Sequence, residues 1–193
     1  MGYVNDKNIL VDEAQAFLST GLYNGLDIKE IKEIGPLWGS WKTWRGCQTD
    51  NVICHELNKA GELLKRNFQN SCNFYIANAN WVKLDRPEKV NLYEGSFVDE
   101  FQPEEIVAMH LAGSQSDIVL LLGFDLTEKE RNPNKLLEHQ AQAYRALIIN
   151  LLESNPEVQW VLVDHPGPIM KKMQHIPNLV MDSMENCLGL KSL

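Results

Sequence analysis

The stretch Asp117-Ile118-Val119-Leu120-Leu121-Leu122-Gly123 decides the fold class of this sequence. It is a continuous apolar run that is too short for a buried helix and that ends at a glycine. Strands of parallel sheets have this composition because helices cover both of their faces. We therefore expect residues 117–123 to form a central strand of a parallel sheet.

A helix and a second strand are expected after this run. Asn132-Pro133-Asn134 is typical of a helix start with proline at the first helical position. Apolar residues then recur three or four positions apart, at Leu137, Ala141, Tyr144, Ile148 and Leu151. Pro156 ends the helix, which we place at 133–154, because proline disfavours helical geometry in the residue before it. Residues 158–163 are the next strand, and a connection of this length predicts that the two strands run parallel, side by side or nearly so.

Shorter segments continue the alternation of strands and helices. Further strands are expected at 31–34, 72–77, 90–93 and 179–181, and further helices at 11–18 and 103–112. Residues 50–68 fit either one helix or a strand at 51–54 followed by a helix from Asn58, and we favour the second interpretation. This order predicts an α/β fold, a three-layer Rossmann-like domain with a mainly parallel sheet. At 193 residues, the chain is expected to be one domain spanning residues 1–193.

Composition and charge exclude several classes of protein. The net charge is −8 and no basic stripe is present, so nucleic acid is not an expected partner. The longest apolar run is far shorter than the roughly 20 residues that cross a bilayer, so no membrane span is expected. The N-terminal residues lack the pattern of a signal peptide. A cytoplasmic protein is therefore predicted.

The four cysteines are expected to be reduced and buried. They stand at Cys47, Cys54, Cys72 and Cys187, without a Cys-x-x-Cys pair. Cys54-His55 with Cys47 nearby offers zinc-ligand types, but the spacing matches no zinc finger. We therefore expect no metal site, and the sequence does not identify a cofactor.

The carboxyl ends of the expected strands locate a candidate site, because ligands of open parallel sheets bind beyond those ends. Asp125 and His165 each follow a predicted strand, and we expect them to face one crevice as catalytic residues. The carboxylate of Asp125 would orient a hydroxyl or a metal, and the imidazole of His165 would transfer a proton. A shift of one residue at the strand end would point Asp164 inward instead. Asn78 and Asn80 follow the strand 72–77 and belong to the same edge.

The stretch Ile34-Gly35-Pro36-Leu37-Trp38-Gly39-Ser40-Trp41 is expected to be a loop in the wall of this crevice. Gly35, Trp38, Gly39 and Ser40 are the candidate ligand-binding residues, with Ser40 also able to cap a short helix. The stretch lacks the Gly-x-Gly-x-x-Gly and Walker patterns, so a plain turn before a helix competes with a phosphate cradle. Trp38, Trp41 and Trp44 would share a helical face, and a satellite core is favoured over a ligand-stacking platform.

The first functional hypothesis is a protein that binds a nucleotide or a nucleotide sugar. A transferase is one specific form of this hypothesis. Leu122-Gly123-Phe124-Asp125 after a buried strand resembles the same position in sialyltransferase-like glycosyltransferases, over about four residues. That resemblance implies a nucleotide-sugar ligand. The Gly-Asn-Gly-Pro type loop of that family is not reproduced at Ile34-Gly35-Pro36.

Two other classes of function remain open. A hydrolase would use Ser40 as nucleophile and His165 as base, although Trp38 replaces the first glycine of the usual Gly-x-Ser-x-Gly turn. A non-catalytic module would use the tryptophan-rich segment and the acidic second half to bind a protein partner. Binding of nucleotides, measured by thermal shift, distinguishes the first hypothesis from the last.

Overall fold

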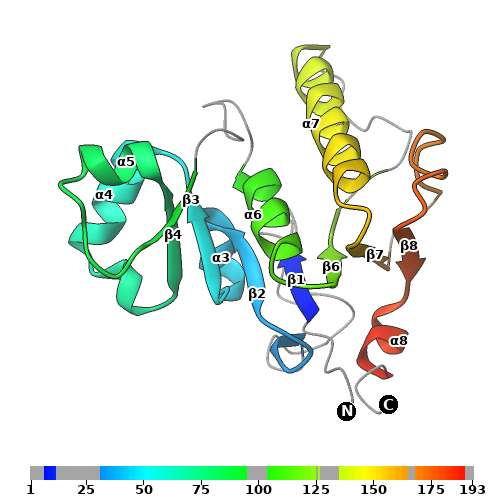
Figure 1. Cartoon of the computed structure of the whole chain (residues 1–193), viewed down its shortest axis with the longest axis horizontal. Helices are drawn as coiled ribbons and strands as arrows, with labels where there is room; N and C mark the ends of the chain where they lie inside the picture. Colours follow the sequence, from blue (N-terminus) through cyan, green and yellow to red (C-terminus); the bar gives the residue numbers. More distant parts are fainter. Residues whose placement is uncertain are drawn as a thin grey trace.

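The computed structural model describes residues 7–11, 31–94, 104–124, 126, 135–164 and 168–189, which form an α/β fold (Figure 1). The strands are β1 (Lys7–Val11), β2 (Leu37–Ser40), β3 (Asn51–Cys54), β4 (Asn73–Ala77), β5 (Asn91–Tyr93), β6 (Ile118–Leu122), β7 (Gln159–Val163) and β8 (Leu179–Asp182). The helices are α3 (Trp41–Cys47), α4 (Leu57–Lys65), the 3-10 turn η1 (Phe68–Asn70), α5 (Asn78–Lys83), α6 (Glu104–Gly113), α7 (Lys135–Ser154) and α8 (Met184–Gly189).

All eight strands belong to one parallel sheet with the order β5-β4-β3-β2-β1-β6-β7-β8. The expected α/β class with a parallel sheet is therefore confirmed. The parallel pairing of β6 and β7 agrees with the prediction, with Leu120 opposite Val161, and α7 ends at Ser154 as expected. The expected helix start at 132–134 lies outside the described residues.

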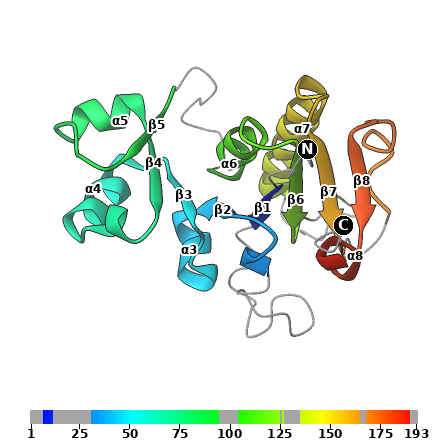
Figure 2. The ribbon, with the colours of Figure 1, turned by 60° about the horizontal axis from the view of Figure 1, so that its bottom comes forward.

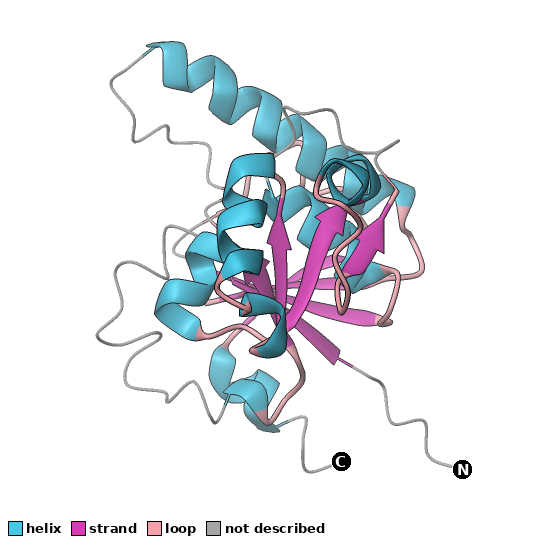
Figure 3. Cartoon of the chain, turned by 90° about the vertical axis from the view of Figure 1, so that its left-hand side faces the viewer, coloured by secondary structure: helices cyan, strands magenta, loops and turns pink. Residues whose placement is uncertain are grey.

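Helices cover both faces of this sheet. Figure 2 shows α6 and α7 on one side and α3 and α8 on the other, and Figure 3 shows helices on both sides of the strands. Side chains along β6 alternate between the two layers: Val119 and Leu121 pack under α6 and α7, and Leu120 and Leu122 pack on the opposite side. Burial on both faces explains why this strand is a continuous apolar run.

The N-terminal part of the sheet differs from the prediction. The strand expected at 31–34 lies instead at Leu37–Ser40, and Ile31 is helical and 1% exposed. Ile31 and Ile34 are three residues apart, which is a helical spacing, and the strand begins only after Pro36. β1 was not predicted, because it begins with the polar pair Lys7-Asn8. Val11 ends β1, and the rest of the helix expected at 11–18 lies outside the described residues.

The ambiguous segment 50–68 follows the favoured interpretation. Residues 51–54 form β3, and helix α4 begins at Leu57, one residue before the expected start. Val52 and Cys54 of β3 pack against Ala60 and Leu63 of α4, and this packing selects the strand and shorter helix over one long helix.

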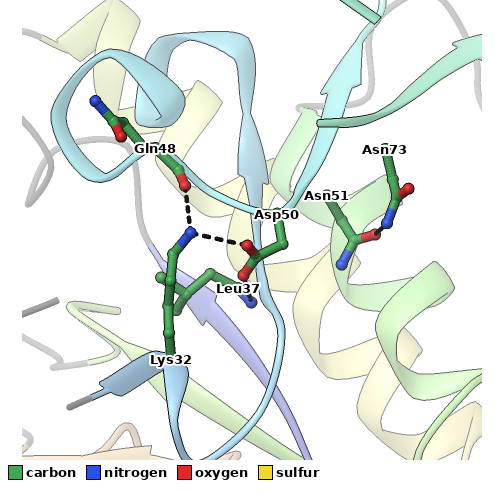
Figure 4. A network of polar contacts seen from close by, with 6 residues as sticks. All are labelled: Lys32, Leu37, Gln48, Asp50, Asn51 and Asn73. Carbon is green, nitrogen blue, oxygen red and sulfur yellow. Dashed lines mark hydrogen bonds and ion pairs between the residues drawn. The ribbon is translucent and has the colours of Figure 1, made fainter. Parts of the chain in front are cut away.

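A polar network joins the amino ends of β2, β3 and β4 (Figure 4). Asp50 precedes β3, and its carboxylate accepts hydrogen bonds from the Leu37 amide at 2.9 Å and from Lys32 Nζ at 2.8 Å. Lys32 Nζ also donates to the carbonyl oxygen of Gln48 at 2.7 Å, and Asn73 donates to Asn51 at 3.0 Å. These bonds fix the amino edge of the sheet, opposite the edge at which ligands of such sheets bind.

We expect Asp50→Ala to lower the free energy of unfolding by about 1–3 kcal/mol, because it leaves the amide of the buried residue Leu37 without an acceptor. Lys32→Met removes the ion pair between partly exposed side chains and the exposed hydrogen bond to the Gln48 carbonyl oxygen, and leaves the Leu37 amide bonded to Asp50; it is expected to cost about 0–1 kcal/mol. Urea unfolding of both variants measures the difference. Equal losses would mean that the ion pair, and not the amide bond, is the main contribution.

Candidate functional site

The strand order creates a topological switch point between β1 and β6. From β1 the chain builds outward to β5, then returns to the other side of β1 with β6. The last residues of the two strands, Val11 and Leu122, are register partners, so both strands end at the same level. Gly123 follows with φ 82°, a left-handed conformation that favours glycine. Ligands of open α/β sheets bind in the crevice beyond such a point.

The two predicted catalytic residues, Asp125 and His165, lie outside the described residues, and their role stays a prediction. Phe124 and Leu126, on either side of Asp125, are 3% and 1% exposed and belong to the core. β6 and β7 end in register, with Leu122 opposite Val163. The segments that contain Asp125 and His165 therefore begin at neighbouring strand ends.

Asp164, the alternative to His165, has a structural contact. The backbone of Asp164 has φ 49°, and its amide donates to the carbonyl oxygen of Asp182 at 2.9 Å. Its carboxylate accepts a hydrogen bond from the Met184 amide at 3.1 Å. The side chain is exposed. Asp164 thus joins the end of β7 to the start of α8.

The segment that was expected to be a binding loop is a strand joined directly to a helix. Trp38, Gly39 and Ser40 lie in β2 and are buried, and Gly35 precedes the strand in a bend. Ser40 is the N-cap of α3, as predicted, and its hydroxyl oxygen accepts the amides of Lys42 and Thr43, both at 3.2 Å. The first free amides of α3 are therefore bonded within the chain. Ligand binding by Gly35, Trp38, Gly39 and Ser40 stays a prediction.

The three tryptophans do not share one face. Trp38 is 1% exposed and lies under α6, with its ring centroid 5.2 Å from that of Tyr75. Trp41 and Trp44 belong to α3 and pack on the cluster of β3, β4 and α4. The expectation of a shared face was wrong because the change from strand to helix falls between Trp38 and Trp41. Trp38 is part of the core, which agrees with the packing role that was favoured over a ligand-stacking platform.

A polar cluster that sequence reasoning missed lies at the carboxyl ends of β3, β4 and β5. His55 follows β3, and its Nδ1 is 2.6 Å from the hydroxyl of Tyr93, the last residue of β5. The backbone amide of His55 donates to Oε1 of Glu104, the first residue of α6, at 2.7 Å. Asn80 of α5 donates to the carbonyl oxygen of His55, also at 2.7 Å. Four elements thus hold one histidine.

Burial and charge set the protonation of this cluster. Burial lowers the pKa of the His55 imidazole, so the ring is neutral at pH 7. Burial also raises the pKa of the Tyr93 hydroxyl, and the negative charge of Glu104 raises it further. Cys54 beside them has a raised pKa for the same two reasons. At neutral pH the cluster therefore contains a neutral imidazole, a phenol and a thiol close to a carboxylate.

Cations surround Trp41 on the opposite side of the sheet. Lys59 Nζ, Arg45 Cζ and Lys42 Nζ lie 4.6, 4.7 and 5.9 Å from the centroid of its ring. Lys59 also pairs with Glu62 at 2.8 Å, and its hydrogen bond and charge lower the pKa of that carboxyl. Cation–π contacts with Trp41 and the ion pair with Glu62, all within the chain, explain the positions of these cations.

The cysteines are free thiols, three of them buried. Burial raises the pKa of Cys47 to about 11 and that of Cys72 to about 12. Within the described ranges, no three His, Cys, Asp or Glu side chains are placed to hold a metal ion. Among the helices that the structure describes, none is long and apolar enough to span a bilayer.

Comparison with known proteins gives a partial similarity. No protein-family model and no solved structure matches the chain. A chloroplastic GTPase ERA-like protein of Oryza sativa subsp. japonica is 28% identical over 99 residues, which are 48% of this chain and 23% of that protein. The matched region thus spans less than a quarter of the relative.

Proposed function

We propose that the chain binds a nucleotide-type small molecule beyond the carboxyl ends of β1 and β6. The observation that carries this proposal is the switch point in an all-parallel sheet, where Val11 and Leu122 end in register. Crevices at this position are the usual ligand sites of doubly wound α/β proteins. The partial similarity to a protein named as a GTPase supports a nucleotide as the class of ligand.

The phosphates would not be held by a loop of the Walker type between β2 and α3. β2 ends at Ser40 and α3 begins at Trp41, so no loop separates the two elements. A Cβ atom on Gly39 would lie 2.8 Å from the Cβ of Thr43, so the start of α3 already fills this space. The switch point is therefore the favoured place for the charged part of the ligand.

Transferase chemistry on a nucleotide sugar is the finer form of this proposal. Asp125 would orient a substrate hydroxyl or a metal, and His165 would transfer a proton. The register of Leu122 with Val163 supports this pair, because the two residues follow neighbouring strand ends. The four free cysteines fit the cytoplasmic setting that we expect for the protein.

The hydrolase alternative has less support. Ser40 is 0% exposed, and its hydroxyl oxygen accepts two amides of α3 and lies 3.3 Å from the hydroxyl of Thr43. A nucleophile must reach its substrate and a base. The capping role of Ser40 thus argues against the Ser40–His165 pair.

A thermal-shift titration with GTP, ATP and UDP-glucose, each with Mg²⁺, tests the proposal. A nucleotide at a hundred times its dissociation constant should add about 2.7 kcal/mol of stability to the fold. We expect Asp125→Asn to weaken this binding by about tenfold or more, the effect of losing one charged hydrogen bond of about 1.5–3 kcal/mol.

The matched control is Asp117→Asn, which makes the same change just before β6, at the other end of that strand. It should bind each nucleotide as the wild type does. If no nucleotide raises the melting temperature, the proposal is wrong and a protein-interaction module becomes the better hypothesis. If the two variants lose binding equally, Asp125 is not part of the site.

A further inference from the structure

The second ring nitrogen of His55 has no partner in the part of the chain that the structure describes. Nε2 is buried and makes no hydrogen bond, whereas Nδ1, the backbone amide and the backbone carbonyl of His55 are all bonded. A buried polar atom without a partner costs about 1–3 kcal/mol. Because the other polar groups of His55 are bonded, the unpartnered Nε2 indicates a hydrogen-bond partner that is not among the described residues.

The hydrogen bond with Tyr93 decides which nitrogen carries the proton. If the Tyr93 hydroxyl donates to Nδ1, the neutral ring has its proton on Nε2 and only one buried group, Nε2–H, lacks a partner. If Nδ1–H donates instead, both the Tyr93 proton and the Nε2 lone pair lack partners. The first tautomer leaves fewer polar groups without a hydrogen-bond partner. Nε2–H is therefore a donor that needs an acceptor.

The charges around His55 select a neutral acceptor. Glu104 lies on the amide side of His55, and its negative charge adds to burial in raising the pKa of both Tyr93 and Cys54. A phosphate oxygen brought to the neutral imidazole would be repelled by this carboxylate. A hydroxyl or carbonyl oxygen would not be repelled, because it carries no net charge.

The position of His55 fits the uncharged part of a ligand bound at the switch point. β3 is separated from β1 by β2 alone, so at about 4.8 Å per strand the two carboxyl ends are roughly 10 Å apart. A nucleotide is long enough to span this distance. Tyr93, the partner of His55, lines a cavity of about 630 Å³ between β5, α6 and α7, although His55 itself does not. The other lining residues are apolar, such as Leu92 and Ile106, and polar, such as Glu94 and Asn150.

We propose that Nε2–H of His55 donates a hydrogen bond to a hydroxyl or carbonyl oxygen in the sugar or base of the bound nucleotide. This inference rests on the proposed nucleotide-binding function. Tyr93 is then a positioning residue, because its hydroxyl fixes the tautomer of His55. Glu104 and Asn80 hold the backbone on either side of the ring.

Calorimetric titration of GTP, guanosine and inorganic tripolyphosphate tests this assignment. His55→Phe keeps a ring but removes the donor, and we expect affinity for GTP and guanosine to fall about tenfold, the effect of one lost hydrogen bond. Affinity for tripolyphosphate should not change, because the phosphates lie elsewhere. His175→Phe makes the same change at an exposed turn and should change none of the three.

Nitrogen-15 NMR of the histidine rings gives a second measurement, in which the ligand titrations use the wild-type protein. The wild-type protein should show His55 protonated at Nε2, and Tyr93→Phe should give a mixture of tautomers. Addition of GTP, guanosine or UDP-glucose should move the Nε2 resonance of His55, and tripolyphosphate should not. If none of the three moves it, the inference is overturned.

The thermal-shift titration and the NMR of His55 together separate this inference from the proposed function. A thermal shift with GTP and no change at His55 would overturn the inference alone. A change at His55 with guanosine, without a thermal shift from any nucleotide, would support the neutral-oxygen site and overturn the proposed function. No response in either measurement would overturn both.

Discussion

Trp38→Ala is expected to lower the free energy of unfolding by about 3–5 kcal/mol, as for other buried tryptophans. Trp38 is 1% exposed, lies in β2 under α6, and its ring packs against that of Tyr75. Removing it leaves a cavity in the largest core cluster that the surrounding strands cannot close. Urea unfolding followed by circular dichroism measures the loss.

Trp38→Phe is the control for this prediction. The Nε1 atom of Trp38 is buried without a hydrogen-bond partner among the described residues, and phenylalanine fills much of the space without carrying that group. It should therefore cost clearly less than alanine. Unchanged stability of Trp38→Ala together with weaker nucleotide binding would contradict the core role and favour a ligand-stacking role.

Gly113 and Trp160 are expected to be strongly coupled in a double-mutant cycle. A Cβ atom on Gly113, the last residue of α6, would lie 2.9 Å from Cη2 of Trp160, which is fully buried in β7. We expect Gly113→Ala to cost about 1–3 kcal/mol through this overlap. Trp160→Ala should cost about 3–5 kcal/mol by opening a cavity.

The double variant should lose less stability than the sum of the two single variants. Without the indole ring, the methyl group that Gly113→Ala introduces meets no obstacle and fills part of the cavity, which corresponds to a coupling of about 0.5–3 kcal/mol. Gly61→Ala in α4 is the control, since its Cβ would lie 3.2 Å from the movable end of Leu84 and should be tolerated. Additive losses at Gly113 and Trp160 would contradict the close contact.

The central part of the fold could be predicted because local and long-range signals agree there. The apolar run of β6, the proline-marked end of α7 and the strand at 159–163 each had one interpretation. The first strands lacked that agreement. β2 contains Gly39, which with Gly35 favoured a loop, and the burial of Trp38 in this strand depends on α6, far away in sequence.

The polar cluster of His55 shows why a site is harder to predict than a fold. Its members come from β5, α5, α6 and the residue after β3, and no spacing in the sequence connects them. Two signals were present: His55 directly follows a predicted strand at the edge where ligands bind, and Asn80 was expected at the same edge. In the sequence, His55 stands out only as a zinc-ligand type beside Cys54, because its actual partners come together only when the sheet is assembled.

The pairing of β1 with β6 has a consequence for how the protein is made on the ribosome. Residues Lys7–Val11 emerge long before one of their two neighbours, Ile118–Leu122, because more than half of the sequence lies between the two strands. Until then, one side of β1 has unpaired backbone groups that can join a strand of another nascent chain. Contacts between such distant segments also slow folding. β1 therefore stays exposed to misassembly for longer than its neighbours, and this exposure ends when β6 has been synthesised.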